Sequence, residues 1–342
     1  IKPLIDGNSA TIADVLAQYA LDEVNKELYA DDIWRHLEER DFKRCKWNTD
    51  PLVLAAVEDC TDRSLPKHTQ ATISGKVIAR DETKIILDKF GTIEEKHAIL
   101  ISGEAGVGKS GVLLQVVESL RKQGKPLLVF RVDRLEPTLL PDEVGRQFGL
   151  PASPANVLKA IAGGRKCLLI IDQLDSVSET SGRNPEFFDC IHEIIEQALN
   201  YPEMSILLAC RKFDLDNDHR FRSLIGKQGF VTVQIRHLPH ETIKQFIKND
   251  LGLDINRLNK KQMDLLSIPL HLSLLAEISQ DSDIDSIDFE TTKDLYDKFW
   301  ERKQRLLHKR LGDSSRWVDV IFSLSNHMSQ HQALIAPASI LD

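Results

Sequence analysis

A glycine-rich octapeptide constrains the fold of this chain more than any other feature. Its sequence, GEAGVGKS, occupies positions 103–110, directly after an apolar run at 98–101 and directly before a segment with helical periodicity. A strand, a glycine-rich turn and a helix in that order bring backbone N–H groups together at a helix N-terminus, where the helix dipole also favours anions. The pattern therefore predicts a phosphate-binding loop; a glycine turn with an incidental lysine is the alternative.

Each residue of this loop has an expected role. We expect Lys109 to reach the β- and γ-phosphates and the Ser110 hydroxyl to ligate Mg²⁺. The backbone of the other loop residues is expected to cradle the phosphates. These residues are Gly103, Glu104, Ala105, Gly106, Val107 and Gly108.

From residue 97 onward, short apolar runs alternate with amphipathic segments, which is typical of a parallel sheet with crossover helices. The five runs are 98–101, 127–132, 167–171, 206–210 and 230–235. The helices predicted between them cover residues 110–122, 142–148, 155–162, 187–199 and 213–224. The predicted fold class is therefore α/β, with the parallel sheet of a P-loop NTPase, about five strands and flanking helices.

Acidic residues follow the third apolar run, which ends in Asp172, with Asp175 shortly after it. A phosphate loop needs a carboxylate at the end of a neighbouring strand to hold magnesium and its waters. We therefore expect Asp172 to be the magnesium-associated acid and Asp175 to orient or deprotonate the attacking water. The alternative role for Asp175 is the cap of a helix or turn.

A basic residue, Arg211, follows the fourth apolar run. A cation at the tip of a strand beside the phosphate loop can sense the γ-phosphate, because that contact exists only when a triphosphate is bound. The alternative is a surface arginine that pairs with an acid between positions 214 and 218.

Helical patterns flank the α/β layer on both sides. Residues 9–65 have helical periodicity, and further helices are predicted at 241–251, 260–267, 270–278, 291–311 and 316–327. We divide the chain into a helical N-terminal or linker region (1–75), a P-loop nucleotide-binding domain (76–238), a small helical domain (239–290) and a last region (291–342).

Composition excludes several classes of protein. With 42% apolar residues the chain can bury a full core, and its net charge of −8 has the wrong sign for wrapping nucleic acid by bulk charge. No apolar run is long enough to span a bilayer, so we expect a soluble cytoplasmic protein without membrane contact. The five cysteines, including Cys45, are widely spaced and are expected to be reduced packing thiols.

Taken together, these motifs resemble those of STAND-class signal-transduction ATPases, most of all the NACHT-like bacterial members, many of which act in antiviral defence. The resembling segments are GEAGVGKS at 103–110, LLIIDQLD at 168–175, LLACR at 207–211, LPHETIKQFI at 238–247 and IPLHLSLLAEI at 268–278. In that family, the residues that match Lys109, Ser110 and Asp172 bind the phosphates and magnesium. Arg211 matches the sensor arginine of the family. Val77, Ile78 and Arg80 match the segment that borders adenine, and Pro269 matches the proline that abuts it.

The resemblance also implies a function. Such proteins are switches that bind ATP or ADP with Mg²⁺ and hydrolyse ATP slowly. ADP holds a closed monomer, a trigger opens it, and ATP drives self-association through the nucleotide-binding domain. The trigger-sensing region and the effector domain would both lie outside this chain, and direct nucleic-acid binding by this core is not expected.

The resemblance further implies that residues 291–342 begin a winged-helix domain. The apolar segments 333–335 and 340–341 come where that domain would continue, so we expect the chain to be the excised core of a longer protein.

The sequence departs from the family pattern at two positions of the acidic motif. Gln173 stands where NACHT-like members commonly have glycine, and Ser176 stands where they have a further acid. The departures in the acidic motif favour slow hydrolysis. A Met-His-Asp triplet, through which many relatives hold ADP, is also missing near the C-terminus. An AAA+-like motor or loader acting on DNA or protein is the alternative function. A small-molecule or nucleotide kinase is a third, but such enzymes carry a lid of arginines over the phosphates, and no compact arginine cluster follows the third apolar run here.

Overall fold

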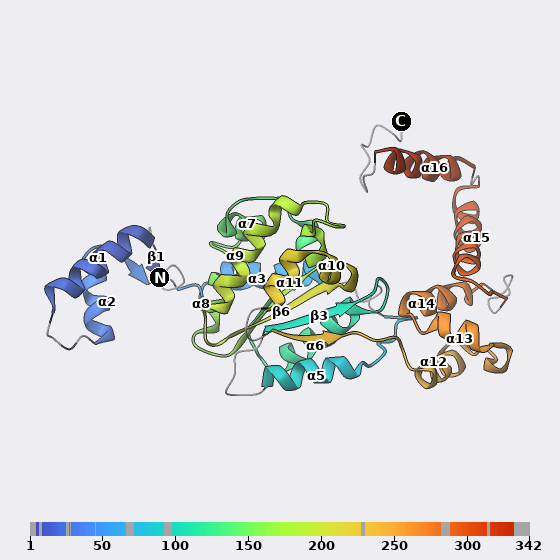
Figure 1. Ribbon diagram of the computed structural model, residues 1–342, viewed down its shortest axis with the longest axis horizontal. Coiled ribbons are helices and arrows are strands. Elements are labelled where there is room, and N and C mark those ends of the chain that lie inside the picture. Colours follow the sequence, from blue (N-terminus) through green and yellow to red (C-terminus); the bar gives the residue numbers. More distant parts are fainter. Residues whose placement is uncertain are drawn as a thin grey trace. The chain divides into compact units, whose positions relative to one another are not determined.

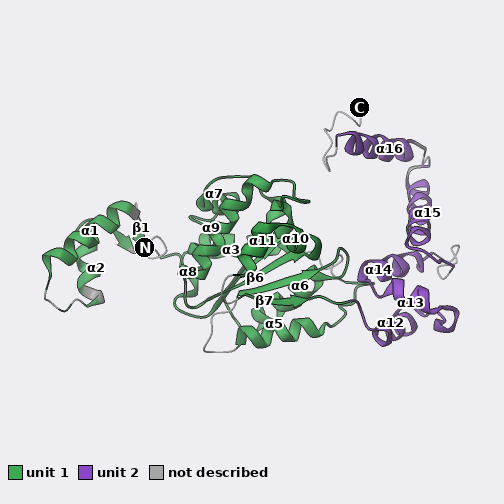
Figure 2. Cartoon of the chain, viewed as in Figure 1, with its two compact units in different colours: residues 1–236 green, residues 237–342 purple. Residues whose placement is uncertain are grey.

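The computed structural model describes residues 5–6, 9–24, 27, 29–44, 46–65, 72–91, 98–226, 230–281, 288–312 and 315–331. The chain divides into two compact units, residues 1–236 and 237–342 (Figure 2). Cys45 and the apolar segments 333–335 and 340–341 lie outside the described residues. Cys60, Cys167, Cys190 and Cys210 are buried free thiols.

The centre of the first unit is a five-stranded parallel sheet with the strand order β4-β5-β6-β3-β7 (Figure 1). Its strands are β3 (Ala98–Gly103), β4 (Leu127–Arg131), β5 (Cys167–Asp172), β6 (Met204–Arg211) and β7 (Phe230–Gln234). The predicted α/β fold with a parallel sheet is confirmed, because each apolar run forms one of these strands. Strand β6 separates β3 from β5, so one strand lies between the phosphate loop and the acid at the end of β5.

Helices cover both faces of this sheet (Figure 1). One face carries α5 (Asp81–Gly91) and α6 (Lys109–Lys122), and the other carries α7 (Pro141–Gln147), α8 (Pro154–Ala162), α9 (Phe188–Leu199) and α11 (His219–Gly226). Successive residues of a strand point to opposite faces. Accordingly, Ile99 and Ile101 pack with α5 and α6, whereas Leu100 packs in the core on the other face.

Helix α3 (Pro51–Ser64) packs against the end strand β4. Its Val57 and Cys60 belong to the same buried core as the strand. The Thr61 hydroxyl oxygen accepts the backbone N–H of Val129 at 3.2 Å, and Cys60 Sγ donates to the Val129 carbonyl at 3.4 Å. The predicted boundary between residues 75 and 76 therefore places α3 in a different region from the sheet against which it packs.

The other elements before the sheet are α1 (Ser9–Asp22), α2 (Ala30–Glu38) and a short antiparallel pair of strands, β1 (Ile5–Asp6) and β2 (Lys43–Arg44). The helices correspond to the periodicity of residues 9–65. The strand pair was not predicted, because two residues are too few to show an alternating pattern.

One predicted helix is wrong as a single element. Residues 213–224 belong to two helices, α10 (Lys212–Asn217) and α11, with Asp218 between them. Asp218 has extended backbone angles, and its buried carboxylate accepts the backbone N–H of Arg220 at 2.8 Å. Such a local side-chain hydrogen bond competes with the helical pattern and breaks the helix here.

The second unit consists of helices. They are α12 (His240–Phe246), a π-helical turn (Ile247–Leu251), a 3-10 turn (Ile255–Arg257), α13 (Lys260–Leu266), α14 (Pro269–Ile278), α15 (Thr292–Leu311) and α16 (Ser315–Gln330). The boundary at 290 and the winged-helix start stay predictions. Within the described part of the chain, no helix combines the length and the hydropathy needed to cross a bilayer.

Candidate nucleotide-binding site

The loop between β3 and α6 has a backbone that requires glycine. Gly106 (φ 76°) and Gly108 (φ 99°) both lie in the left-handed region, where a Cβ atom is unfavourable. Gly108 directly precedes α6, so the end of the loop lies at the amino end of that helix. Backbone N–H groups without a helical partner are available there for an anion.

Lys109, the first residue of α6, turns its side chain back over the loop. Its Nζ donates to the carbonyls of Gly103 at 2.8 Å and Glu104 at 2.9 Å. Burial lowers the pKa of Lys109, and the carboxylates of Asp175 and Asp172 oppose that shift. The ammonium group is therefore held over the loop backbone, close to where phosphate oxygens would bind.

Asp172 ends β5 and is buried, with 2% of the residue exposed. Its Oδ1 accepts the backbone N–H of Gln173 at 2.8 Å. Burial raises the pKa of Asp172 to about 6, although Arg131 and the Gln173 N–H favour the ionised form. A buried carboxylate and the Ser110 hydroxyl in the first turn of α6 are oxygen donors of the kind that Mg²⁺ prefers, so these residues fit a magnesium ion.

Asp175 lies in η2 (Leu174–Val177), the 3-10 turn after β5, and is also buried. Its Oδ2 forms an ion pair with Arg211 Nε at 2.9 Å, whereas its buried Oδ1 has no hydrogen-bond partner among the described residues. Burial raises the pKa of Asp175, and Arg211 opposes the rise. Because buried oxygens normally accept a hydrogen bond, Oδ1 is suited to an attacking or magnesium-bound water.

Arg211 ends β6, and its Cα is paired in register with that of Gly103 in β3. The side chain is half-exposed and pairs with Asp175, not with an acid between 214 and 218 as the alternative held. The described partners of Asp214 and Asp218 are other residues. A γ-phosphate at the loop would compete with Asp175 for this guanidinium group.

Arg131, at the end of β4, was not predicted from the sequence. Its Cα is paired in register with that of Asp172, and its guanidinium donates to both carboxylate oxygens of Asp133, at 2.9 and 2.8 Å. A single arginine after an apolar run carries no signal of its own. Only the strand order, which places β4 beside β5, reveals it as the cation that acts on Asp172.

Gln173, where the sequence departs from the NACHT-like pattern, has left-handed backbone angles of φ 58° and ψ 42°. Glycine adopts these angles without strain, whereas a side chain there costs about 1–2 kcal/mol. The backbone at this position therefore has a conformation that suits glycine even though the residue is glutamine.

The segment expected to border adenine is tied to α6 through Gln115. The Gln115 side chain accepts the N–H of Arg80 at 3.3 Å and donates to the Ile78 carbonyl at 3.0 Å. The Arg80 guanidinium pairs with Glu82 at 3.2 Å, and Val77 is partly exposed. Two hydrogen bonds thus fix this segment to the helix that begins with the loop lysine.

The structure gathers the loop, Asp172, Asp175 and Arg211 at the carboxyl ends of β3, β5 and β6. Pro269 belongs to the second unit, where it is the first residue of α14. The roles given to all of these residues stay predictions.

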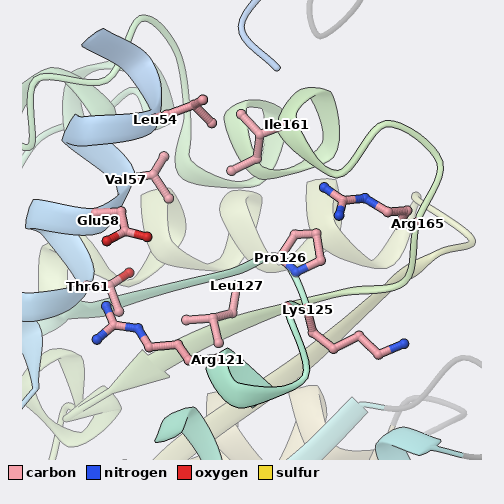
Figure 3. Close-up of a pocket in the computed structure, with 11 residues that line it drawn as sticks. Leu54, Val57, Glu58, Thr61, Arg121, Lys125, Pro126, Leu127, Ile161 and Arg165 are labelled. Carbon is pink, nitrogen blue, oxygen red and sulfur yellow. The ribbon is translucent and has the colours of Figure 1, made fainter. Parts of the chain in front are cut away.

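A separate pocket of about 340 Å³ lies at the amino end of β4 (Figure 3). Its lining includes Leu127, which begins β4, and Val57 and Glu58 of α3. Arg121 in its lining pairs with Asp62 at 2.6 Å. Because the phosphate loop follows the carboxyl end of β3, this pocket is not the candidate nucleotide site.

Comparison with known proteins gives no family. No protein-family profile matches the chain, and no curated protein matches it. AMPPCP-bound DnaA from Aquifex aeolicus has a similar fold, at 16% identity over 75% of this chain and 73% of that chain, with a TM-score of 0.41. Aeropyrum pernix Orc1 in complex with DNA is 13% identical over 76% of this chain and 74% of that chain, with a TM-score of 0.44.

A third structure, the replication initiator DnaA bound to AMPPCP and single-stranded DNA, gives 17% identity over 78% of this chain and 75% of that chain, with a TM-score of 0.38. At these values, none of the similarities supports a conclusion about function. They also do not show the STAND-class, NACHT-like or antiviral identity that the motifs suggested.

Proposed function

We propose that this chain binds ATP or ADP with Mg²⁺ and hydrolyses ATP. The observation that carries the proposal is the arrangement at the carboxyl ends of adjacent strands. The phosphate loop follows β3, the buried Asp172 ends β5, and Arg211, which ends β6, pairs with Asp175, which follows β5. Phosphoryl transfer needs little more than such a loop, a magnesium-holding acid, a residue that positions water and a cation for the γ-phosphate.

Each residue would have one role. Lys109 and the loop N–H groups would hold the phosphates, and Ser110 and Asp172 would hold the magnesium ion, which supplies charge neutralisation when bound. Asp175 would orient or deprotonate the attacking water. Because burial raises its pKa, Asp175 is a stronger base than an exposed carboxylate. Arg211 would contact the γ-phosphate.

The cellular role that we propose is a regulatory switch. Arg211 can pair with Asp175, as it does at 2.9 Å, or with a γ-phosphate, so the state of the pair would report whether ATP or ADP is bound. The external trigger and effector, self-association and a place in antiviral defence rest on the family resemblance alone.

The proposal is tested by the affinity of purified protein for ATP and ADP with Mg²⁺, measured by isothermal titration calorimetry. Lys109→Ala is expected to weaken binding by about tenfold to a hundredfold, because a charge-assisted contact is worth roughly 1.5–3 kcal/mol. The control is Lys122→Ala, an exposed lysine at the far end of α6, which should bind like the wild type. Equal affinity of Lys109→Ala and wild type, or no binding by either, would refute the proposal.

A motor or loader that acts on DNA or protein is the second candidate. The buried Asp175 favours it, because burial raises its pKa and a competent base permits rapid hydrolysis. The similar solved structures are replication initiators, two of them in complex with DNA, but that similarity is too low to decide between the candidates. Steady-state turnover with and without single-stranded DNA separates them: slow turnover that DNA leaves unchanged supports the switch, and rapid, DNA-stimulated turnover supports the loader.

A further inference from the structure

The segment that follows Asp175 is fastened to the break between α10 and α11. Arg220 Nη2 donates to the Val177 carbonyl at 2.8 Å, and Nη1 donates to the Pro185 carbonyl at 3.0 Å. These carbonyls lie on either side of residues 178–184, so one guanidinium group joins the two ends of the loop. Val177 belongs to the same 3-10 turn as Asp175.

Asp218 holds Arg220 in this position. Its buried carboxylate accepts hydrogen bonds from Arg220 Nη2 at 3.0 Å and Nε at 3.3 Å, and from the Arg220 backbone N–H at 2.8 Å. It also accepts the Glu179 backbone N–H, within the loop, at 2.8 Å. Burial opposes ionisation, but these hydrogen bonds outweigh it and lower the pKa of Asp218 to about 2.

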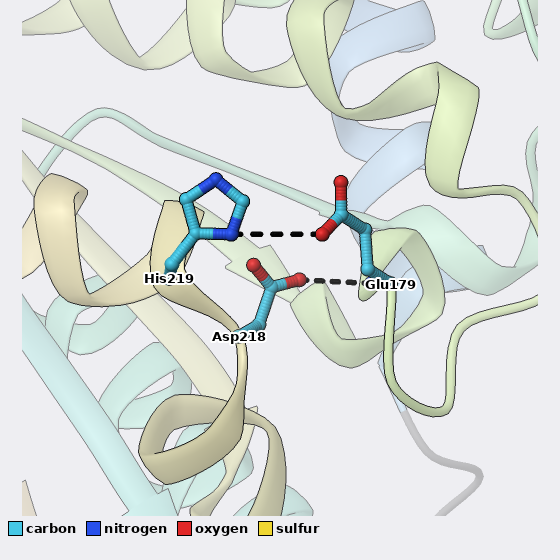
Figure 4. Close-up of side chains that lie close together, drawn as sticks. All are labelled: Glu179, Asp218 and His219. Carbon is cyan, nitrogen blue, oxygen red and sulfur yellow. Dashed lines mark hydrogen bonds and ion pairs between the residues drawn. The ribbon is translucent and has the colours of Figure 1, made fainter.

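The same residues include a potential metal cluster, in which Glu179, Asp218 and His219 place their ligand atoms within 4.8 Å of one another (Figure 4). The two oxygens of Asp218 already accept four hydrogen bonds. Arg220 Nε also lies 3.5 Å from Glu179 Oε1, so a positive charge is already present between the two carboxylates. We therefore interpret the carboxylates of Asp218 and Glu179 as partners of Arg220 and not as metal ligands.

A second contact fastens the loop to α10. The buried Asp214 accepts hydrogen bonds from the hydroxyls of Thr180 at 3.0 Å and Ser181 at 2.6 Å. Helix α10 begins directly after Arg211. The helix that follows Arg211 is therefore bonded to the loop that follows its partner, Asp175.

We propose that Asp218 and Arg220 are positioning residues for Asp175. Through the Val177 carbonyl they fix the 3-10 turn, so that the Asp175 carboxylate keeps its place beside Arg211 and the phosphate loop. This inference rests on the proposed ATPase function, and it assigns to these residues an effect on the hydrolysis step and not on nucleotide affinity.

The test separates those two quantities. Arg220→Lys keeps the positive charge, but a single ammonium group cannot reproduce the planar fork that bonds both carbonyls. We expect its single-turnover rate of ATP hydrolysis to fall by about tenfold to a hundredfold, because small misplacements of a catalytic group have effects of that size. Its affinity for ADP, measured with a fluorescent analogue, should stay within about twofold of the wild type.

Arg222→Ala is the matched control, because Arg222 is an exposed arginine on the same helix. It should leave both the rate and the affinity unchanged. Amide hydrogen exchange gives a second readout: in Arg220→Lys, residues 174–184 should exchange faster while β3 and α6 keep their protection. Asp218→Asn should reproduce both effects and serves as the second variant if Arg220→Lys does not fold.

A wild-type rate in folded Arg220→Lys and Asp218→Asn would overturn this inference and leave the ATPase function standing. Equal losses of rate and of ADP affinity would also overturn it, because they indicate general damage to the site. Wild-type protein that binds no nucleotide would refute the proposed function and this inference together.

Discussion

Asp172 is the last residue of β5, and burial of its carboxyl group raises its pKa to about 6. The folded state therefore binds this proton more tightly than the unfolded state, whose pKa is about 3.9. Between about pH 4 and pH 6 the Asp172 contribution to the free energy of unfolding falls as pH rises, and it stays unfavourable at neutral pH.

Asp172→Asn removes that ionisation and keeps the side-chain shape. At neutral pH we expect the variant, without nucleotide, to be more stable than the wild type by about 3 kcal/mol, and at about pH 4 the difference should vanish. Urea denaturation at both pH values measures it. A variant less stable than the wild type at neutral pH would contradict this account of Asp172.

Gln173 has a left-handed backbone at φ 58°. Gln173→Gly removes a strain of about 1–2 kcal/mol but adds roughly 0.5–1 kcal/mol of backbone entropy to the unfolded chain. We therefore expect a net rise of about 0.5–1 kcal/mol in the free energy of unfolding, measured by urea denaturation. Gln173→Ala, which keeps a Cβ atom, is the control and should show no such gain.

At the scale of elements, the sequence predicts best what local pattern determines. The strands of the sheet appear as short apolar runs because both faces of a parallel sheet are buried. The prediction of one helix over 213–224 was wrong at Asp218. The sequence of an amphipathic stretch does not show whether an acid within it is exposed or hydrogen-bonded to the backbone. That outcome depends on Arg220 and the loop that it contacts.

Long-range pairing explains the other omissions. The loop, Asp172 and Arg211 could be predicted as site residues because each comes at the end of an apolar run. The carboxyl ends of parallel strands lie at the same edge of a sheet, so these residues come together. Arg131 could not, since its importance arises from the place of β4 beside β5. The packing of α3 on β4 depends likewise on contacts between segments far apart in the chain.

Thr61 of α3 makes one of those contacts, accepting the Val129 N–H in a buried position. Thr61→Val keeps the shape but leaves that N–H without an acceptor, which costs about 1–3 kcal/mol. We expect the free energy of unfolding to fall by that amount. Thr61→Ser retains the hydroxyl and should lose clearly less; equal losses would show that packing of the methyl group, not the hydrogen bond, is what matters.

At the scale of the whole molecule, the switch proposal makes association depend on the nucleotide. A ligand shifts an equilibrium only toward the form that it binds more tightly. We expect the chain to sediment as a monomer with ADP and Mg²⁺, and to shift toward larger species with a non-hydrolysable ATP analogue. Lys109→Ala should abolish the difference. Identical sedimentation in both nucleotides would contradict nucleotide-driven self-association while leaving ATP hydrolysis intact.

The position of α3 also bears on how this chain behaves among its own copies. Strand β4 ends the sheet, and both backbone groups of Val129 are bonded by side chains of α3. An uncovered end strand is a template on which a strand of another molecule can add. Helix α3 thus covers this edge at Val129, and we expect a chain begun at residue 76 to present the edge as such a template.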